Sequence, residues 1–241
     1  MPKMLVVNAS PHGEKGITGI IQKAFVQGAV AAGAEVDEVF LNRKKINPCM
    51  GCFTCWIKTP GKCVFKDDQA DLIEKCDWCD IFVLATPLYV DGMTAQAKIF
   101  LDRLIPCAKP EFIILDDHCR HPQRIDREWK FVLISGCGFY EMDNFEALQH
   151  HCERMCLNFH AQYAGHVLRP HAHILEFADM LPEETSKCLN AISKAGEEVC
   201  LHGKISNEIM TEASAPIVPR SAYVNAVNVY WDQELSKIKR K

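Results

Sequence analysis

Short apolar runs alternate with stretches of helical periodicity along most of the chain. Each run is about four to eight residues long and rich in branched aliphatic side chains, as expected of strands that are buried on both faces. We assign five such strands, at Met4–Val7, Val36–Leu41, Ile81–Ala85, Phe131–Ser135 and about Ala161–Leu168. The stretches between them are too long for simple turns, so the pattern predicts strands that are connected by helices.

The connecting stretches carry apolar residues at helical spacing, and Gly33 is a stop signal for the first of them. Helices are predicted at Thr18–Ala32, from Asp67 and Asp68 as candidate caps to about Asp77, and at Thr94–Leu104, Glu141–Cys156 and Pro182–Leu201. Strands that alternate with helices require right-handed crossovers and a parallel sheet covered on both faces. The sequence therefore predicts a three-layer α/β/α sandwich with a five-stranded parallel sheet in flavodoxin-like order.

The last part of the chain differs from this pattern. After residue 203 it runs through Pro216 and Pro219 into an apolar and aromatic segment that ends in lysines. Two prolines disfavour a helix there, and so apolar a segment needs a surface to cover. We therefore divide the chain into a domain of residues 1–203 and a C-terminal arm of residues 204–241. The arm is expected to pack on a neighbouring subunit of a homodimer or homotetramer, the alternative being an arm folded over its own subunit.

Composition and charge limit the classes of partner. A formal net charge of −4 offers no basic face for nucleic acid or for an anionic membrane surface. Met1 leads straight into the first strand without a signal-peptide pattern, and no stretch approaches the ~20 apolar residues of a membrane span. The 13 cysteines then indicate a reducing cytoplasm, where cysteines stay as thiols or bind metal.

Four of these cysteines crowd into one loop, residues 47–66, which is inserted after the second strand. They are Cys49, Cys52, Cys55 and Cys63. Pro60 and Gly61 favour a turn that returns Cys63 to the other three. Four thiolates suit a 4Fe–4S cluster or Zn²⁺, but zinc sites usually pair two Cys-x2-Cys units about 12–20 residues apart. Iron–sulfur is thus the favoured metal, with zinc and metal-free thiols as alternatives.

Three other loops follow strands at the edge of the sheet where ligands bind in this architecture. Residues 8–18 form a turn with glycine and hydroxyl groups that leads into a helix, a pattern typical of phosphate binding at a helix N-terminus. Residues 86–92 contain Tyr89, and residues 136–140 form a glycine-flanked turn. Together the loops predict a site for a mononucleotide with a flat head group.

These residues resemble those of the flavodoxin-like NAD(P)H-dependent FMN reductases, and within them the iron–sulfur flavoproteins. The resemblance covers about residues 1–170. It rests on Asn8-Ala9-Ser10-Pro11 with Thr18, on the cysteine segment with Asp67-Asp68, and on Thr86-Pro87-Leu88-Tyr89 through Gln96, Lys98 and Asp102-Arg103. The chain departs from the family at His12, where arginine is usual, at Ile17, where asparagine is usual, and in its long gap before Cys63.

The resemblance implies FMN as cofactor. It implies that Ser10, His12 and Thr18 hold the phosphate, that Pro87, Leu88 and Tyr89 line the isoalloxazine with Val90 beside them, and that Gly136, Cys137 and Gly138 contact its polar edge. Because flavin N5 is the reactive centre, no catalytic side chain is needed.

The predicted function is an FMN-dependent oxidoreductase. It passes electrons from NAD(P)H, a transient donor, or from a reduced carrier to a quinone, flavin, nitro compound or electron-carrier protein, by way of a 4Fe–4S cluster where one is bound. The alternatives are a non-catalytic FMN electron shuttle or redox sensor, and a zinc-stapled binding protein.

Overall fold

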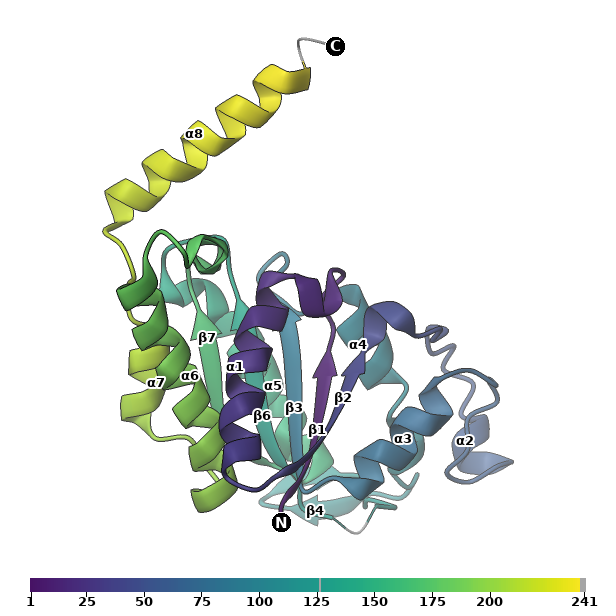
Figure 1. Cartoon of the computed structure of the whole chain (residues 1–241). Helices are drawn as coiled ribbons and strands as arrows, with labels where there is room; N and C mark the ends of the chain where they lie inside the picture. Colours follow the sequence, from purple (N-terminus) through teal and green to yellow (C-terminus); the bar gives the residue numbers. More distant parts are fainter. Residues whose placement is uncertain (126, 239–241) are drawn as a thin grey trace.

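The computed structural model describes residues 1–125 and 127–238. Its centre is a parallel sheet in the order β2-β1-β3-β6-β7 (Figure 1). The strands are β1 (Lys3–Asn8), β2 (Glu35–Phe40), β3 (Ile81–Pro87), β6 (Lys130–Gly136) and β7 (Gln162–Arg169). All five apolar runs are therefore strands, and the predicted flavodoxin-like order is confirmed.

Helices cover both faces of the sheet, and alternate residues of each strand face opposite layers. In β1, Leu5 and Val7 belong to one apolar cluster, whereas Met4 and Val6 belong to the other. The first cluster includes side chains of α3 (Gln69–Trp78), α4 (Ala95–Asp102) and α5 (Glu146–Phe159). The second includes side chains of α1 (Ile17–Ala31), α6 (Pro182–His202) and α7 (Asn207–Ser214). This arrangement is the predicted three-layer sandwich.

Two glycines let α1 and α6 approach each other closely. A Cβ on Gly28 would lie 1.7 Å from the carbonyl oxygen of Ser193, and one on Gly196 would lie 2.0 Å from that of Phe25. No side chain fits at either position without separating the helices. The contact fixes α1, whose N-terminus faces the ligand edge of the sheet.

Several short elements complete the chain. The hairpin of β4 (Ile113–Leu115) and β5 (His118–Arg120) lies outside the main sheet, and α2 (Thr54–Ile57) lies in the cysteine-rich loop. The 3₁₀ turns are η1 (Gly13–Lys15), η2 (Leu41–Arg43), η3 (Ile105–Cys107), η4 (Met142–Phe145) and η5 (Ala172–Phe177). The turn η4 forms the start of the helix predicted at Glu141–Cys156, whose α-helical part is α5. The other short elements were not predicted, because each is too short to show a period in the sequence.

The C-terminal segment is helical, and this corrects the expectation that its prolines disfavour a helix. Pro219 immediately precedes α8 (Arg220–Ile238), at a helix start where proline is tolerated. Helix α7 packs against β7 and α6, with Ile209 and Ala213 in the core, whereas α8 projects away from the body (Figure 1). The division into two domains at residue 203 stays a prediction, but the projecting part begins only near Arg220.

Across the described part of the chain, no helix combines the length and the apolar character that crossing a bilayer requires.

Candidate functional site

The loops after β1, β3 and β6 meet at the carboxyl edge of the sheet. The Ala9 N–H donates to the Ala85 carbonyl at 2.7 Å, and the Leu88 N–H donates to the Gly136 carbonyl at 2.9 Å. Thr94, the N-cap of α4, donates its hydroxyl to the Ala9 carbonyl at 2.8 Å. The predicted ligand loops are thus tied to one another by hydrogen bonds.

The first loop forms a cradle at the N-terminus of α1. Its first-turn amides, those of Gly16, Ile17 and Thr18, have no protein acceptor among the described residues, as is usual for a free helix N-terminus. The hydroxyl of Ser10 lies 3.3 Å from the point that a Cβ on Gly16 would occupy. The Cβ atom of His12 lies 2.8 Å from the same point. The cradle therefore depends on the absence of a side chain at Gly16.

The structure distinguishes the three residues expected to hold a phosphate. Ser10 and Thr18 are buried, and the Ser10 hydroxyl accepts from the His12 N–H at 3.3 Å. His12 itself is exposed. Ile17, where the family usually has asparagine, packs partly buried against the core cluster of α1 and α6. Backbone amides and the two hydroxyls are consequently the groups best placed for an anion.

The second loop makes a tight turn with an aromatic ring at its start. Tyr89 and Gly92 exchange backbone hydrogen bonds at 2.9 and 3.1 Å, and Val90 and Asp91 between them have φ values of 49° and 56°. A β-branched residue rarely adopts such a φ, and strain of this kind gathers at ligand sites. Pro87 and Leu88 are half-buried, whereas Tyr89 and Val90 are exposed. The turn thus holds an apolar edge open to solvent.

In the third loop, the backbone and the thiol of Cys137 are already hydrogen-bonded to other residues of the protein. Both backbone groups of Cys137 are engaged, its N–H by Arg169 and its carbonyl by Ala172. Its buried sulfur accepts from the Phe139 N–H at 3.2 Å, and burial raises the pKa of the thiol. Of the three residues expected to contact a cofactor here, only Gly138 is exposed. The roles of all these residues toward a cofactor stay predictions.

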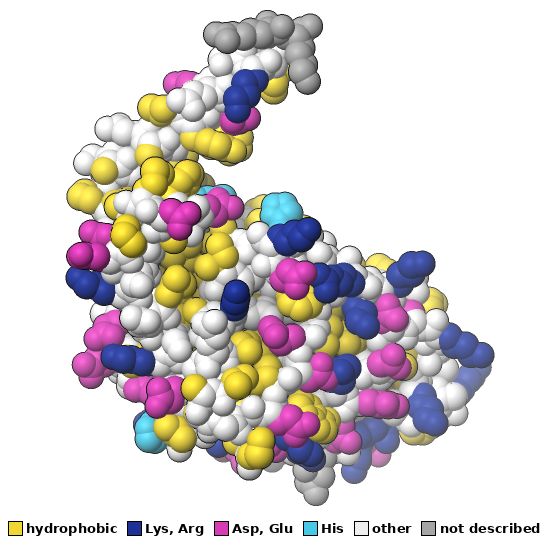
Figure 2. Space-filling view, viewed as in Figure 1, with side chains coloured by type: hydrophobic (Ala, Val, Ile, Leu, Met, Phe, Trp, Pro, Cys, Tyr) yellow, Lys and Arg dark blue, Asp and Glu magenta, His cyan; other side chains and the backbone are white. Residues whose placement is uncertain are grey.

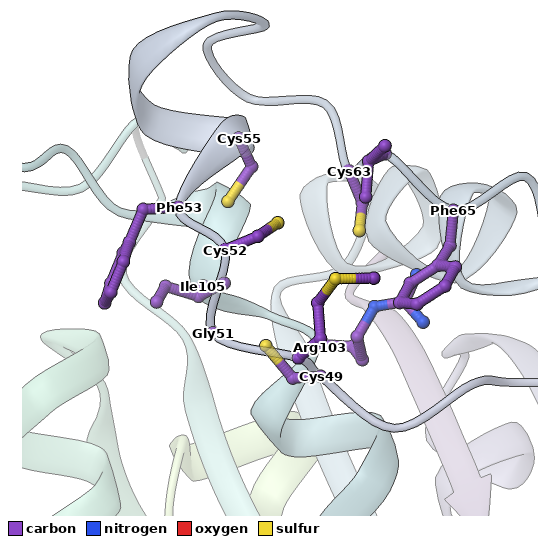
Figure 3. Close-up of a pocket in the computed structure, with 11 residues that line it drawn as sticks. Cys49, Gly51, Cys52, Phe53, Cys55, Cys63, Phe65, Arg103 and Ile105 are labelled. Carbon is purple, nitrogen blue, oxygen red and sulfur yellow. The ribbon is translucent and has the colours of Figure 1, made fainter.

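The four clustered cysteines surround one small pocket (Figure 3). Positive φ values at Gly51 and Phe53 turn the chain into the short helix that carries Cys55, which is the buried member. The Gly61 N–H then donates to the Cys55 carbonyl at 2.9 Å and closes the loop. The return of Cys63 to the other three cysteines through the Pro60-Gly61 turn is confirmed.

The thiols differ in electrostatic environment. Hydrogen bonds with the side chain and backbone of Thr54 lower the pKa of the exposed Cys52. Burial raises the pKa of Cys55, and the negative charges of the other three thiolates, that of Cys63 above all, raise it further. The sulfurs are close enough to repel one another when ionised, so a bound cation would relieve this repulsion.

Arg103 forms the floor of the pocket and was given no role by the sequence. It is 1% exposed, and its guanidinium makes a bidentate pair with Asp67 at 2.9 and 3.0 Å. It also donates to the Asn47 carbonyl at 2.6 Å, and its Cζ lies 4.9 Å from the ring centre of Phe65. Asp67, expected as a helix cap, is thus chiefly the partner of this arginine.

The charges of this pair stabilise each other. Burial would raise the pKa of the Asp67 carboxyl, but hydrogen bonds from Arg103 and Asn47 outweigh burial and hold that pKa well below its usual range. Burial likewise opposes the charged form of Arg103, yet the hydrogen bond with Asp67 and the charge of Cys63 raise its pKa. A fixed positive charge therefore lies beside the thiols.

Within residues 1–125 and 127–238, no three histidine, cysteine or acidic side chains lie close enough to ligate a single metal ion. One zinc ion would need sulfurs about 3.8 Å apart, given Zn–S bonds of about 2.3 Å. Sulfurs that surround a pocket suit a larger group that binds each thiolate at a separate corner.

Comparison with known proteins shows what this chain is similar to. Residues 2–116 match the model of the NADPH-dependent FMN reductase family. An iron–sulfur flavoprotein from Archaeoglobus fulgidus is 44% identical over 75 residues, which are 31% of this chain and 33% of that protein. One from Methanocaldococcus jannaschii is 33% identical over 104 residues, or 43% of this chain and 52% of that protein.

Solved structures share the fold at low identity. An FMN-dependent NADH-azoreductase from Bacillus anthracis, in complex with FMN, aligns with a TM-score of 0.60 and 14% identity over 83% of this chain and 98% of that chain. An NAD(P)H:quinone oxidoreductase from Methanothermobacter marburgensis gives a TM-score of 0.58 and 16% identity over 82% and 96% of the two chains. At these identities the likeness shows the flavodoxin-like fold alone.

By the family match, residues 2–116 are similar to the NADPH-dependent FMN reductase family. Both curated relatives are iron–sulfur flavoproteins by name, and the similarity to them is confined to part of the chain. The matches span about a third to a half of the length of these two curated relatives.

Proposed function

We propose that this protein is an FMN-dependent oxidoreductase that takes electrons from NAD(P)H or a reduced carrier. The acceptor is a quinone, a flavin, a nitro compound or an electron-carrier protein. The observation that carries the proposal is the combination of a helix-N-terminal cradle and an open aromatic edge at the same side of the sheet. The family match supports the same cofactor. Bound FMN would supply the hydride and electron chemistry, so the chain has to bind and orient it.

Each part of the edge has a task in this proposal. The amides of Gly16, Ile17 and Thr18 would bind the phosphate, because free N–H groups and the helix dipole attract an anion. Ser10 would add a hydroxyl donor. The turn at Tyr89 would cover one face of the ring and limit the access of water. His12 is exposed and would stay a solvent-facing neighbour of the phosphate.

The cysteine pocket is the proposed site of a 4Fe–4S cluster. Cys49, Cys52, Cys55 and Cys63 fit such a group because all four line one pocket and because soft thiolates are its usual ligands. Helix α4 connects the two sites: its cap Thr94 contacts the flavin edge, and Arg103 directly after its last residue lines the pocket. Eight residues of helix are about 12 Å long, so the sites are near neighbours.

Turnover separates an enzyme from a shuttle or sensor. We expect NADH or NADPH to bleach the flavin absorbance of the anaerobic protein, and a quinone or nitro compound to restore it over many cycles. Stopped-flow absorbance with each nucleotide measures this. A flavin that is reduced by dithionite but by neither nucleotide would favour the shuttle or sensor, and a colourless protein with stoichiometric zinc would favour the zinc-stapled alternative.

We also propose that α8 joins two copies of the chain. At its root, the Tyr223 hydroxyl donates to the Gly138 carbonyl at 2.6 Å, and the Tyr140 hydroxyl donates to the Val218 carbonyl at 2.9 Å. Beyond this root, the rest of α8 is mostly exposed to solvent in the described part of the chain. It nevertheless carries several apolar side chains on its surface (Figure 2). These are Val224, Val229, Tyr230, Trp231, Leu235 and Ile238. Because α8 starts beside the proposed flavin edge and points away from its own subunit, a second copy of the chain would cover these side chains.

The double substitution Tyr230→Glu and Trp231→Glu is expected to convert a homodimer or homotetramer into monomers, because it places charge in an apolar contact. The control Gln233→Glu adds charge at an exposed polar position of the same helix and should leave the assembly intact. Light scattering measures the mass of each protein. A wild-type protein that is already monomeric at micromolar concentration would rule out this role for α8.

A further inference from the structure

Arg103 has a buried nitrogen, Nε, that the protein leaves without a hydrogen-bond partner among the described residues. Its two terminal nitrogens are taken by Asp67 and Asn47, as described above. This Nε–H belongs to a side chain that lines the cysteine pocket (Figure 3).

The surroundings limit what this donor can bind. A buried N–H without an acceptor is costly, so a native structure is expected to supply one. Apart from the cysteines, the side chains around the pocket are apolar or, in Met50, only weakly accepting. Among the side chains that line the pocket, the cysteine sulfurs are therefore the main acceptors available to this donor.

The guanidinium is also held rigidly. Asp67 binds both terminal nitrogens, and the Phe65 ring lies 4.9 Å from Cζ. These contacts fix the plane of the group and hence the direction of the Nε–H bond. If the guanidinium rotated toward another acceptor, it would lose its two charge-assisted hydrogen bonds with Asp67.

We propose that Arg103 is a positioning and tuning residue for the cluster: its Nε–H donates a hydrogen bond to a sulfur atom of the cluster or of its thiolate ligands. This inference rests on the proposed 4Fe–4S site. A hydrogen bond to sulfur and a nearby positive charge both stabilise the more negative, reduced state, and so raise the reduction potential. Asp67 and Phe65 serve this role by orienting the arginine.

The test compares full-length proteins reconstituted anaerobically with iron and sulfide. Arg103→Gln removes the charge and the Nε–H, whereas Arg103→Lys keeps the charge alone. The control Arg127→Gln removes an arginine that pairs with Asp80 at 3.0 Å on the surface, away from the pocket. Iron content is measured first, and the cluster potential is then measured by a redox titration followed by EPR.

We expect Arg103→Gln to favour the oxidised cluster at least tenfold, a fall of about 59 mV for one electron. Arg103→Lys should shift less in the same direction, and Arg127→Gln should match the wild type. A wild-type protein that takes up no iron contradicts the cluster itself. A fully loaded Arg103→Gln with the wild-type potential overturns only the role of Arg103.

A measurement on the wild-type chain covers the case in which the arginine variants do not fold. With ¹⁵N-arginine incorporated, pulsed EPR of the reduced cluster should detect magnetic coupling to a nitrogen nucleus, because a hydrogen bond brings Nε close to the cluster sulfur. The absence of this coupling in a loaded, reduced sample would overturn the inference.

Discussion

Gly16→Val is expected to weaken FMN binding by on the order of a hundredfold. The new side chain would start 3.3 Å from the Ser10 hydroxyl and would fill the cradle in front of the first amides of α1. Hydrogen bonds to charged groups contribute about 1.5–3 kcal/mol each, so losing two of them costs at least about 3 kcal/mol. Such a loss is roughly a hundredfold in Kd. Titration of the apoprotein with FMN, followed by flavin fluorescence, measures the effect.

Two control variants isolate the cradle. Glu14→Val places the same side chain on an exposed neighbouring residue whose surface pair with Arg43 contributes little. It should bind FMN as the wild type does. Ser10→Ala removes one hydroxyl but no amide, so we expect a weakening of only a few-fold. If Gly16→Val leaves both the melting temperature and the FMN affinity unchanged, the cradle is not the site that binds the FMN phosphate.

Cys52→Ser is expected to abolish most of the iron uptake. Without one of four thiolates the cluster loses a corner ligand and becomes open to solvent and oxidation. Wild-type protein reconstituted anaerobically should hold about four iron atoms per chain. Iron and sulfide analysis of both proteins, with a visible spectrum, gives the comparison.

Cys119→Ser is the matched control for this substitution, because Cys119 is also an exposed free cysteine but lies in the β4–β5 hairpin. It should retain all of its iron. Equal iron in Cys52→Ser and Cys119→Ser would show that uptake does not involve the pocket. Tight binding of one zinc ion with no iron would instead favour the zinc alternative.

The layered fold was predictable because its signals are local. The three central strands β1, β3 and β6 are buried on both faces, so each appears as a nearly uninterrupted apolar run, as in Ile81–Ala85. Helix α8 was missed because Pro216 and Pro219 were taken to disfavour a helix in the segment that follows. Proline stops a helix in its interior, yet Pro219 stands just before the first turn.

The site was predictable in part. The cysteine spacing and the Pro60-Gly61 turn indicated one pocket, since both act within a few residues of each other. The place of Arg103 in that pocket was not predictable, because Arg103 is held by Asp67, which is 36 residues away in the sequence and meets it only through tertiary folding. Similarly, the backbone bonds of Cys137 to Arg169 and Ala172 depend on a neighbouring strand and its following loop. Spacing in the sequence carries no information on such contacts.

The central claim is that the edge formed by the loops after β1, β3 and β6 binds FMN. The most direct test is the flavin content of the full-length protein, purified without oxygen, with the released flavin identified by chromatography and mass spectrometry. The account predicts about one FMN per chain, or the same stoichiometry after FMN is added to a partly empty preparation. A protein that contains no flavin and takes up no added FMN, or one that binds only FAD, would contradict it.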